Sequence, residues 1–386
     1  MKILHTIGGL GAKSGGTSTC TYDLLSAMQQ NSCNVELLTP AVIDADDKLL
    51  GVGEEWIKVL PNDCCSPFAI SKNIKNFLVK SDYDLYHTNG LWMYVIHITA
   101  AIARQKGKPY IISPHGMLYP QALHRSYWKK LPLIHLYFKK DIRNATCIHA
   151  TCRQEMEYVR QFGYEGAVAV ISNPVVMPDF TDLLFKNKES FLINNQRRKF
   201  GFLGRLHSRK AVENLIYGMS GLGEDASRAE LVIMGKGDDS YEQFLHSEVE
   251  RLGLKNVTFA GFVNGRQKYE QLSELSALFV PSDFENFGMI VTEALSVGTP
   301  VMASLGTPWE ELNTHRCGWW IDRSPENITS VMQQVLELST DELLQMGQRG
   351  MELVKNNYSA DKVALQMKQL YEWILNKCEK PEFVYN

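Results

Sequence analysis

The feature that most restricts the fold is a regular alternation of short apolar runs with segments long enough to form helices, repeated along the chain. Such alternation is typical of parallel sheets with helices on both faces. The expected strands are residues 2–7, 35–39, 56–60, 84–88, 109–113, 146–150, 168–171, 199–203, 230–234, 257–260, 277–280, 300–303 and 318–321. The sequence therefore predicts an α/β fold.

The chain length divides these strands between two sheets, because 386 residues are too many for one ordinary hydrophobic core. We expect a first domain over residues 1–178, a connection over 179–198 that lacks a clear hydrophobic period, and a second domain over 199–359. Residues 360–386 form a final helical segment. The clearest expected helices are residues 17–30, 91–106, 153–162, 325–338, 340–356 and 360–377.

Composition indicates a globular enzyme of the cytoplasm. The hydrophobic and charged fractions, 45% and 22%, lie near the averages for soluble proteins. The eight cysteines include no Cys-x-x-Cys pair, which argues against a zinc knuckle or a redox pair and favours free thiols in a reducing compartment. The longest apolar run, 91–103, is shorter than the roughly 20 residues that a spanning helix needs.

Two glutamates are spaced along a strand-turn-helix segment over residues 281–295, which reads Pro-Ser-Asp-Phe-Glu-Asn-Phe-Gly-Met-Ile-Val-Thr-Glu-Ala-Leu. Glu285 lies in the expected turn, and Glu293 lies two turns along the helix that follows. Gly288 relieves the tight turn, and the first amides of the helix are free to bind oxygen. This arrangement can hold a sugar nucleotide at both ends.

Two cations lie five residues apart in the turn after the strand at 199–203, where the sequence reads Gly-Arg-Leu-His-Ser-Arg-Lys. Arg205 can bind phosphate oxygens bidentately, and Lys210 supplies a compact charge. Together they can clamp a diphosphate and stabilise it as a leaving group.

Two further segments of the first domain follow strands. The glycine-rich loop at 8–16 lets main-chain amides approach phosphate, and Thr17 or Ser18 is expected to cap the next helix. The loop lacks the Gly-Lys-Ser/Thr ending of a P-loop. His115 follows the strand at 109–113, at the end of the strand where open α/β sheets bind ligands. Its expected role is hydrogen bonding to a sugar or to a leaving phosphate.

No metal site is expected. Two Asp-x-Asp triplets occur, Asp44 to Asp46 in an acidic loop and Asp82 to Asp84 directly before a strand. Their settings favour solvated or capping carboxylates over a manganese site.

The segment 125–143, here called the basic aromatic segment, mixes six cations with tyrosine, tryptophan and phenylalanine, and Asp141 is its single acidic residue. Basic aromatic helices often rest on anionic membrane surfaces, and a plain helix with a solvated basic face is the alternative. Nucleic acid is a poorer partner, because the net charge of the chain is −3 and no recognition module is visible.

These motifs resemble the signature of the retaining glycosyltransferases of family 4. The resemblance implies a GT-B fold, in which two Rossmann-like domains face each other across a cleft and the last helix packs back on the first domain. It also implies metal-independent transfer of a sugar, with retention of configuration, from a nucleotide-diphosphate sugar to a glycan or lipid-linked acceptor. A bacterial cell-surface polysaccharide (O-antigen, capsule or exopolysaccharide) is the implied product. The implied location of the enzyme is the cytoplasm or the inner face of the cytoplasmic membrane.

The resemblance assigns roles to particular positions, with no cofactor beyond the donor substrate. The implied catalytic residues are His115, Arg205, Lys210 and Glu285. The implied donor-binding residues are Gly15, Gly16, Arg205, Lys210, Phe262, Glu285, Asn286, Phe287, Gly288, Met289, Ile290 and Glu293. Ala211 departs from the pattern, since glycine is commoner there. A nucleotide-sugar epimerase or hydrolase on the same scaffold, or a non-catalytic membrane-associated partner, are the alternatives; the intact cations and glutamates speak against the second.

Overall fold

The structure is a computed structural model that describes residues 1–11, 15–41, 47–63, 68–195 and 197–386. Contacts divide the chain into two compact units. Unit 1 contains Met1–Val176 together with Ala360–Asn386, and unit 2 contains Met177–Ser359. Within the described ranges, no helix combines the length and the apolar character needed to cross a membrane.

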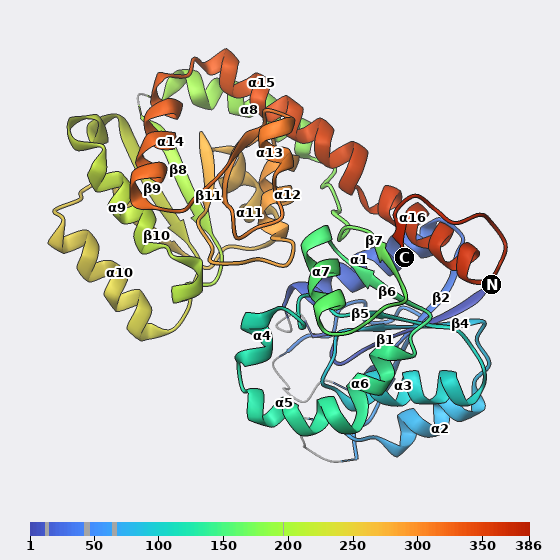
Figure 1. The fold of residues 1–386 in the computed structure, drawn as a ribbon. Coiled ribbons are helices and arrows are strands. Elements are labelled where there is room, and N and C mark those ends of the chain that lie inside the picture. The colour runs from blue at the N-terminus through green and yellow to red at the C-terminus, as the bar shows by residue number, and fades with distance from the viewer. Residues whose placement is uncertain (12–14, 42–46, 64–67, 196) are drawn as a thin grey trace. The chain divides into compact units, whose positions relative to one another are not determined.

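Unit 1 is built on an eight-stranded sheet, counted over the described residues, in the order β14-β7-β6-β5-β4-β1-β2-β3 (Figure 1). Its strands are β1 (Lys2–Ile7), β2 (Asn34–Pro40), β3 (Ile57–Leu60), β4 (Leu85–Asn89), β5 (Tyr110–Ser113), β6 (Cys147–Ala150), β7 (Ala167–Val170) and β14 (Val384–Tyr385). All pair in parallel except β14, which runs antiparallel to β7. Parallel strands leave their carboxyl ends along one edge, where ligands bind in open sheets.

Helices pack on both faces of this sheet. Their bounds are α1 (Gly16–Gln30), α2 (Lys72–Lys80), α3 (Tyr94–Gln105), α4 (Pro120–His124), α5 (Tyr127–Leu133), a π-helical turn (Ile134–Phe138), α6 (Lys139–Arg143), α7 (Arg153–Gln161) and α16 (Ala360–Ile374). α1 packs against α16 over one buried apolar cluster, and α2 and α3 pack over another. The final helix thus completes the core of unit 1, which the first 176 residues begin.

Unit 2 is built on a second parallel sheet, in the order β10-β9-β8-β11-β12-β13. Its strands are β8 (Arg198–Leu203), β9 (Ala229–Met234), β10 (Val257–Gly261), β11 (Ala277–Val280), β12 (Val301–Ser304) and β13 (Gly318–Ile321). The two units thus form the pair of Rossmann-like sheets expected from the sequence. The bounds of each expected strand lie within one residue of those of an observed strand. Strand β14 was not predicted.

The helices of unit 2 form two packed groups, which Figure 1 shows on opposite faces of its sheet. The first group is α9 (Glu213–Gly221), α10 (Asp239–Arg251) and α14 (Pro325–Glu337). The second is α8 (Thr181–Asn194), α11 (Gly265–Ser273), α12 (Met289–Ser296) and α15 (Thr340–Leu353). Short turns complete the unit: 3₁₀ turns at Ser208–Lys210 and Gly223–Arg228, α13 (Glu311–Thr314) and a π-helical turn at Val354–Tyr358.

Helix α8 corrects the prediction of an interdomain connection without a clear hydrophobic period over 179–198. The buried face of α8 carries Lys188 between Leu184 and Leu192, and this lysine interrupts the apolar period. Its Nζ donates to the main-chain oxygens of Ser273 at 2.9 Å and Leu275 at 2.5 Å, and to Thr299 Oγ1 at 2.9 Å. Three acceptors match the three N–H donors of an ammonium group, so tertiary contacts make a buried lysine acceptable here.

Candidate functional site

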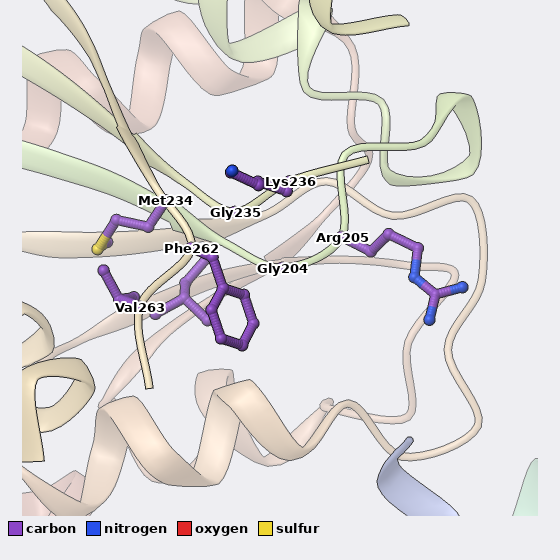
Figure 2. Close-up of a pocket in the computed structure, with 8 residues that line it drawn as sticks. Gly204, Arg205, Met234, Gly235, Lys236, Phe262 and Val263 are labelled. Carbon is purple, nitrogen blue, oxygen red and sulfur yellow. The ribbon is translucent and has the colours of Figure 1, made fainter. Parts of the chain in front are cut away.

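A pocket with a volume of about 260 Å³ opens at the carboxyl ends of three neighbouring strands of unit 2, β8, β9 and β10. It is lined by Leu203, Gly204, Arg205, Met234, Gly235, Lys236, Phe262 and Val263. Figure 2 shows the ring of Phe262 and the guanidinium of Arg205 extending downward from the strand ends in that view. Phe262 is 67% exposed, so a large aromatic face is available to a ligand.

Close backbone contacts shape the floor of this pocket. The amide of Gly235 donates to Gly261 O at 2.7 Å, and the amide of Leu206 donates to Lys236 O at 3.0 Å. Gly235 has a φ of 148°, and a Cβ there would lie 1.9 Å from Gly204 O. Glycine is therefore required where the two strand ends approach each other.

Lys210 and Glu285 form an ion pair in the same unit. Lys210 ends the 3₁₀ turn after β8, and Glu285 lies between β11 and α12. Ser282 Oγ donates to the same carboxylate oxygen at 2.7 Å, and the Glu285 amide donates to Gly306 O at 2.9 Å. The lysine and glutamate side chains are 17% and 14% exposed. The structure thus brings together a cation and a carboxylate that the sequence analysis placed in separate motifs.

The turn between Glu285 and α12 is held by an aromatic cluster. Phe287 is buried against Trp309 and Tyr358, with ring centroids 5.1 and 5.7 Å away, and its carbonyl accepts from Trp309 Nε1 at 2.5 Å. Gly288 has a φ of 78° directly before the helix, which glycine adopts without strain. The first turn of α12 begins with the partly buried Met289 and Ile290.

Glu293 lies on α12, as expected, and forms an ion pair with Lys268 of α11, with Nζ and Oε1 2.9 Å apart. Asn286, next to Glu285, is partly buried in the turn. Ala211, where the sequence departs from the family pattern, has a φ of 48° and no exposed surface. An alanine therefore occupies the left-handed region that favours glycine.

The remaining predicted site residues belong to unit 1. Gly15 has a φ of 91° and is the residue before α1, which begins at Gly16. Neither Thr17 nor Ser18 caps this helix, contrary to expectation, because the helix starts earlier and Ser18 Oγ donates to Gly9 O at 2.8 Å. A Cβ at Gly15 or Gly16 would meet no described atom within 4 Å.

His115 follows β5 and has a φ of 50°, in the left-handed region that few non-glycine residues adopt. Its Nε2 lies 3.4 Å from Asn89 Oδ1 at the end of β4. The next amide, Gly116 N–H, donates at 2.5 Å to the carboxylate of Glu155, a fully buried residue of α7. Strained backbone that is held by buried partners is common at functional sites. Asn89 and Glu155 were missed because neither residue has a local spacing signal.

The carboxylates that were considered for metal binding have other settings. Asp44 and Asp46 lie outside the described residues. Asp84 accepts from the Lys2 amide at 2.7 Å, which lowers the pKa of its carboxyl group, and Asp82 pairs with Lys108 at 3.1 Å. Among the residues described, no group of three or more His, Cys, Asp or Glu side chains is placed to hold a metal ion.

The basic aromatic segment forms α5, the π-helical turn and α6. Trp128 and Leu136 are 80% and 67% exposed, among exposed cations. Lys130 differs from the others, since its Nζ donates to Ala122 O and Arg125 O. Asp141 does not oppose the surface cations, because it is buried and accepts from Arg104 at 2.7 Å.

Two family models match this chain. The model described as glycosyl transferases group 1 matches residues 185–353, and the model described as glycosyltransferase family 4 matches residues 14–177. An uncharacterised glycosyltransferase of Methanocaldococcus jannaschii is 31% identical over 180 residues, 45% of each chain. A 41.2 kDa protein from the cps region of Klebsiella pneumoniae is 24% identical over 229 residues, 58% of this chain and 60% of that protein. The chain thus spans about half the length of these curated relatives.

A solved structure shows the same fold. HepE of Anabaena, in complex with UDP and glucose, has a TM-score of 0.73 and 18% identity, and the superposition covers 96% of this chain and 99% of that chain. With its two parallel sheets, and with matches to both halves of the family pattern, the chain belongs to the glycosyltransferases of family 4, which have the GT-B fold.

Proposed function

We propose that this glycosyltransferase moves a sugar from a nucleotide-diphosphate sugar, with retention of configuration, to a glycan or lipid-linked acceptor of cell-surface polysaccharide biosynthesis. The observation that carries the proposal is the cluster of Lys210, Glu285 and Ser282 in the unit that also holds the pocket at the strand ends. A partly buried cation oriented by a carboxylate suits a diphosphate whose negative charge grows during the reaction.

Each predicted site residue of unit 2 has a proposed part in holding the donor. The exposed ring of Phe262 offers a face on which a nucleobase can stack. Arg205, at the same pocket, binds the diphosphate bidentately, and Lys210 uses N–H donors not directed at Glu285 for its other oxygens. Glu293, with Asn286 to Ile290, holds the sugar nucleotide at the start of α12.

The proposed chemistry needs no metal ion. Arg205 and Lys210 neutralise the departing diphosphate, which takes the proton of the acceptor hydroxyl as the new bond forms on the same face of the sugar. HepE, with the same fold, is described in complex with UDP and glucose, and the Klebsiella relative comes from a cps region, which supports a nucleotide sugar as donor and a surface polysaccharide as product.

Donor turnover tests this proposal. Purified protein is incubated with UDP-, GDP-, ADP- and dTDP-sugars, with and without lipid-linked or oligosaccharide acceptors, and the anomeric configuration of any product is read by NMR. We expect one donor class to raise the melting temperature and to give an α-linked product from an α-linked donor. Inversion of configuration, or release of free sugar that no acceptor suppresses, would contradict the proposal. Release of free sugar would favour the hydrolase alternative.

We further propose that the basic aromatic segment brings the enzyme to the anionic inner face of the cytoplasmic membrane. Arg125, Lys129 and Lys140 are exposed beside Trp128 and Leu136. Each cation near such a surface contributes about 1 kcal/mol, so three changes to glutamine should weaken liposome binding about 100-fold.

A matched control removes the same charge elsewhere in unit 1, by changing the exposed Lys72, Lys75 and Lys80 of α2 to glutamine. Binding to phosphatidylglycerol liposomes at low salt should survive in this control. Equal losses in the two triple variants would mean that net charge alone, and not the segment, attracts the membrane.

A further inference from the structure

A row of buried polar side chains crosses the centre of the sheet in unit 1, outside the residues assigned roles above. Its members are His5 of β1, His87 and Asn89 of β4, Ser113 of β5, His149 of β6 and Tyr371 of α16. Each is at most 4% exposed. Buried polar groups are costly unless they are paired, so the hydrogen bonds of this row determine which atoms carry hydrogen.

At one end of the row, a main-chain carbonyl orients Asn89. Its Nδ2 lies 3.3 Å from Thr6 O and 3.2 Å from His5 Nδ1. A carbonyl oxygen can only accept, so the amide nitrogen must face Thr6. The side-chain oxygen then faces His115 Nε2, 3.4 Å away, and that nitrogen must carry the hydrogen.

At the other end, a second main-chain carbonyl orients His149. Its Nε2 lies 2.8 Å from Ile171 O and must donate. Nδ1 of a neutral ring then accepts, and its partner is Ser113 Oγ at 2.7 Å. Having donated its hydrogen, Ser113 Oγ accepts from His87 Nε2 at 2.6 Å.

Tyr371 joins the two ends. Its hydroxyl donates to His87 Nδ1 at 2.8 Å and accepts from His5 Nε2 at 2.7 Å. His5 Nδ1 is therefore an acceptor, as the amide nitrogen of Asn89 requires. The carbonyls at the two ends of the row independently give the same direction of hydrogen-bond donation along it. Reversing the row would turn lone pairs toward Thr6 O and Ile171 O.

The row needs neutral imidazoles, because a protonated ring has two donors and no acceptor. Burial lowers the pKa of His5 to about 3 and that of His149 to about 4, and it lowers the pKa of His87 well below its usual value. His115 retains some exposed surface, but burial of its ring lowers its pKa as well. At neutral pH each ring thus has one donor and one acceptor.

We propose that Asn89 is a positioning residue that fixes His115 in the tautomer with hydrogen on Nε2, so that Nδ1 accepts a hydrogen bond from a hydroxyl group of the sugar substrate. This rests on the proposed function and on the role expected for His115 from the sequence, which is hydrogen bonding to the sugar or to the leaving phosphate. Ionised phosphate oxygens are acceptors only, so an Nδ1 lone pair cannot bind them. Of the two roles expected from the sequence, contact with the sugar is therefore favoured over contact with the leaving phosphate.

NMR of the unaltered protein tests the tautomer directly. The full chain is labelled with ¹⁵N-histidine, and the His115 signals are assigned as those lost in His115→Gln. Long-range ¹H–¹⁵N correlations distinguish the protonated nitrogen from the bare one. We expect hydrogen on Nε2 of His115, and hydrogen on Nδ1 would overturn the proposal.

Variants test the role of Asn89. In Asn89→Ala we expect His115 to populate both tautomers and kcat/KM to fall about tenfold, the scale of one oriented hydrogen bond, while the affinity for nucleoside diphosphate stays unchanged. The control Tyr164→Phe removes a different buried polar group of unit 1, a hydroxyl that donates to Ala145 O at 3.1 Å, and should leave the His115 signals unmoved. A single unchanged His115 tautomer in Asn89→Ala would refute the positioning role.

Ligand titration separates the hydroxyl from the phosphate. We expect UDP-glucose or another turned-over nucleotide sugar to shift the His115 Nδ1 signal, and UDP alone to leave it in place. An equal shift with UDP alone would overturn the assignment to a hydroxyl. If no nucleotide sugar is turned over while the wild-type tautomer is as expected, the proposed function and the contact with a sugar hydroxyl fail, and only the control of the His115 tautomer by Asn89 stands.

Discussion

The ion pair between Lys210 and Glu285 permits a quantitative test of the proposed donor site. Each side chain is more than four-fifths buried, and each supports the position of the other. We expect Lys210→Ala and Glu285→Ala each to lower kcat/KM on the order of 100-fold, or about 2.7 kcal/mol, the usual scale for one preorganised polar group.

The double variant shows whether the two residues act as one unit. Independent losses would multiply to about 10⁴-fold, whereas residues in contact usually couple by about 0.5–3 kcal/mol. Because Glu285 orients the ammonium group of Lys210, we expect a loss of only about 10³-fold, which is a coupling of about 1.4 kcal/mol.

Initial rates at subsaturating donor, together with urea denaturation, provide the measurement. Each single variant leaves a partly buried charge without its partner, at a cost of about 1–3 kcal/mol, but both residues lie on turns and the fold should survive. Arg209→Ala, in the same turn as Lys210, is the matched control and should retain activity within about threefold. Wild-type rates in either single variant, or a fully multiplicative double variant, would refute the reasoning.

Four further outcomes are expected. Transfer should persist in excess EDTA, because Arg205 and Lys210 supply the countercharge; a reaction lost in chelator and restored by manganese would contradict this. Ala211→Gly should raise the free energy of unfolding by about 1 kcal/mol in urea, since it relieves a φ of 48°, and a destabilised variant would show that packing of the methyl group dominates. Lys188→Met should cost about 3 kcal/mol by leaving buried acceptors unpaired, whereas Lys186→Met on the exposed face of α8 should cost less than about 0.5. Burial lowers the pKa of Lys188 to about 7, so the folded state binds fewer protons than the unfolded state between about pH 7 and 10.5. The free energy of unfolding of the wild type should therefore rise with pH over that window more steeply than that of Lys188→Met. Equal slopes for the two proteins would refute this.

The strands were predictable because those of a parallel sheet, buried on both faces, read as continuous apolar runs. Helix α8 was not, since Lys188 on its buried face is acceptable only through acceptors about 85 to 111 positions away in sequence. Strand β14 is two residues long and pairs with β7, far away in the chain, so no local pattern marks it.

The candidate site divides in the same way. Arg205, Lys210 and Glu285 lie in the turns that come after strands β8 and β11, so their positions beyond the strand ends could be predicted from local sequence. The contact between Lys210 and Glu285 could not, because it joins turns 75 residues apart. Asn89, Glu155 and Tyr371 were missed for a related reason: a buried polar residue is explained by its tertiary partners, and spacing does not reveal them.

The discontinuous composition of unit 1 has a consequence for biosynthesis. Unit 2 is a contiguous stretch, Met177–Ser359, and all its strands are available once that stretch has left the ribosome. Unit 1 must wait for Ala360–Asn386, which bring α16 against α1 and pair β14 with the edge strand β7. The earlier-synthesised half should therefore finish folding last, with the apolar face of α1 and an open sheet edge exposed to chaperones until translation passes residue 386.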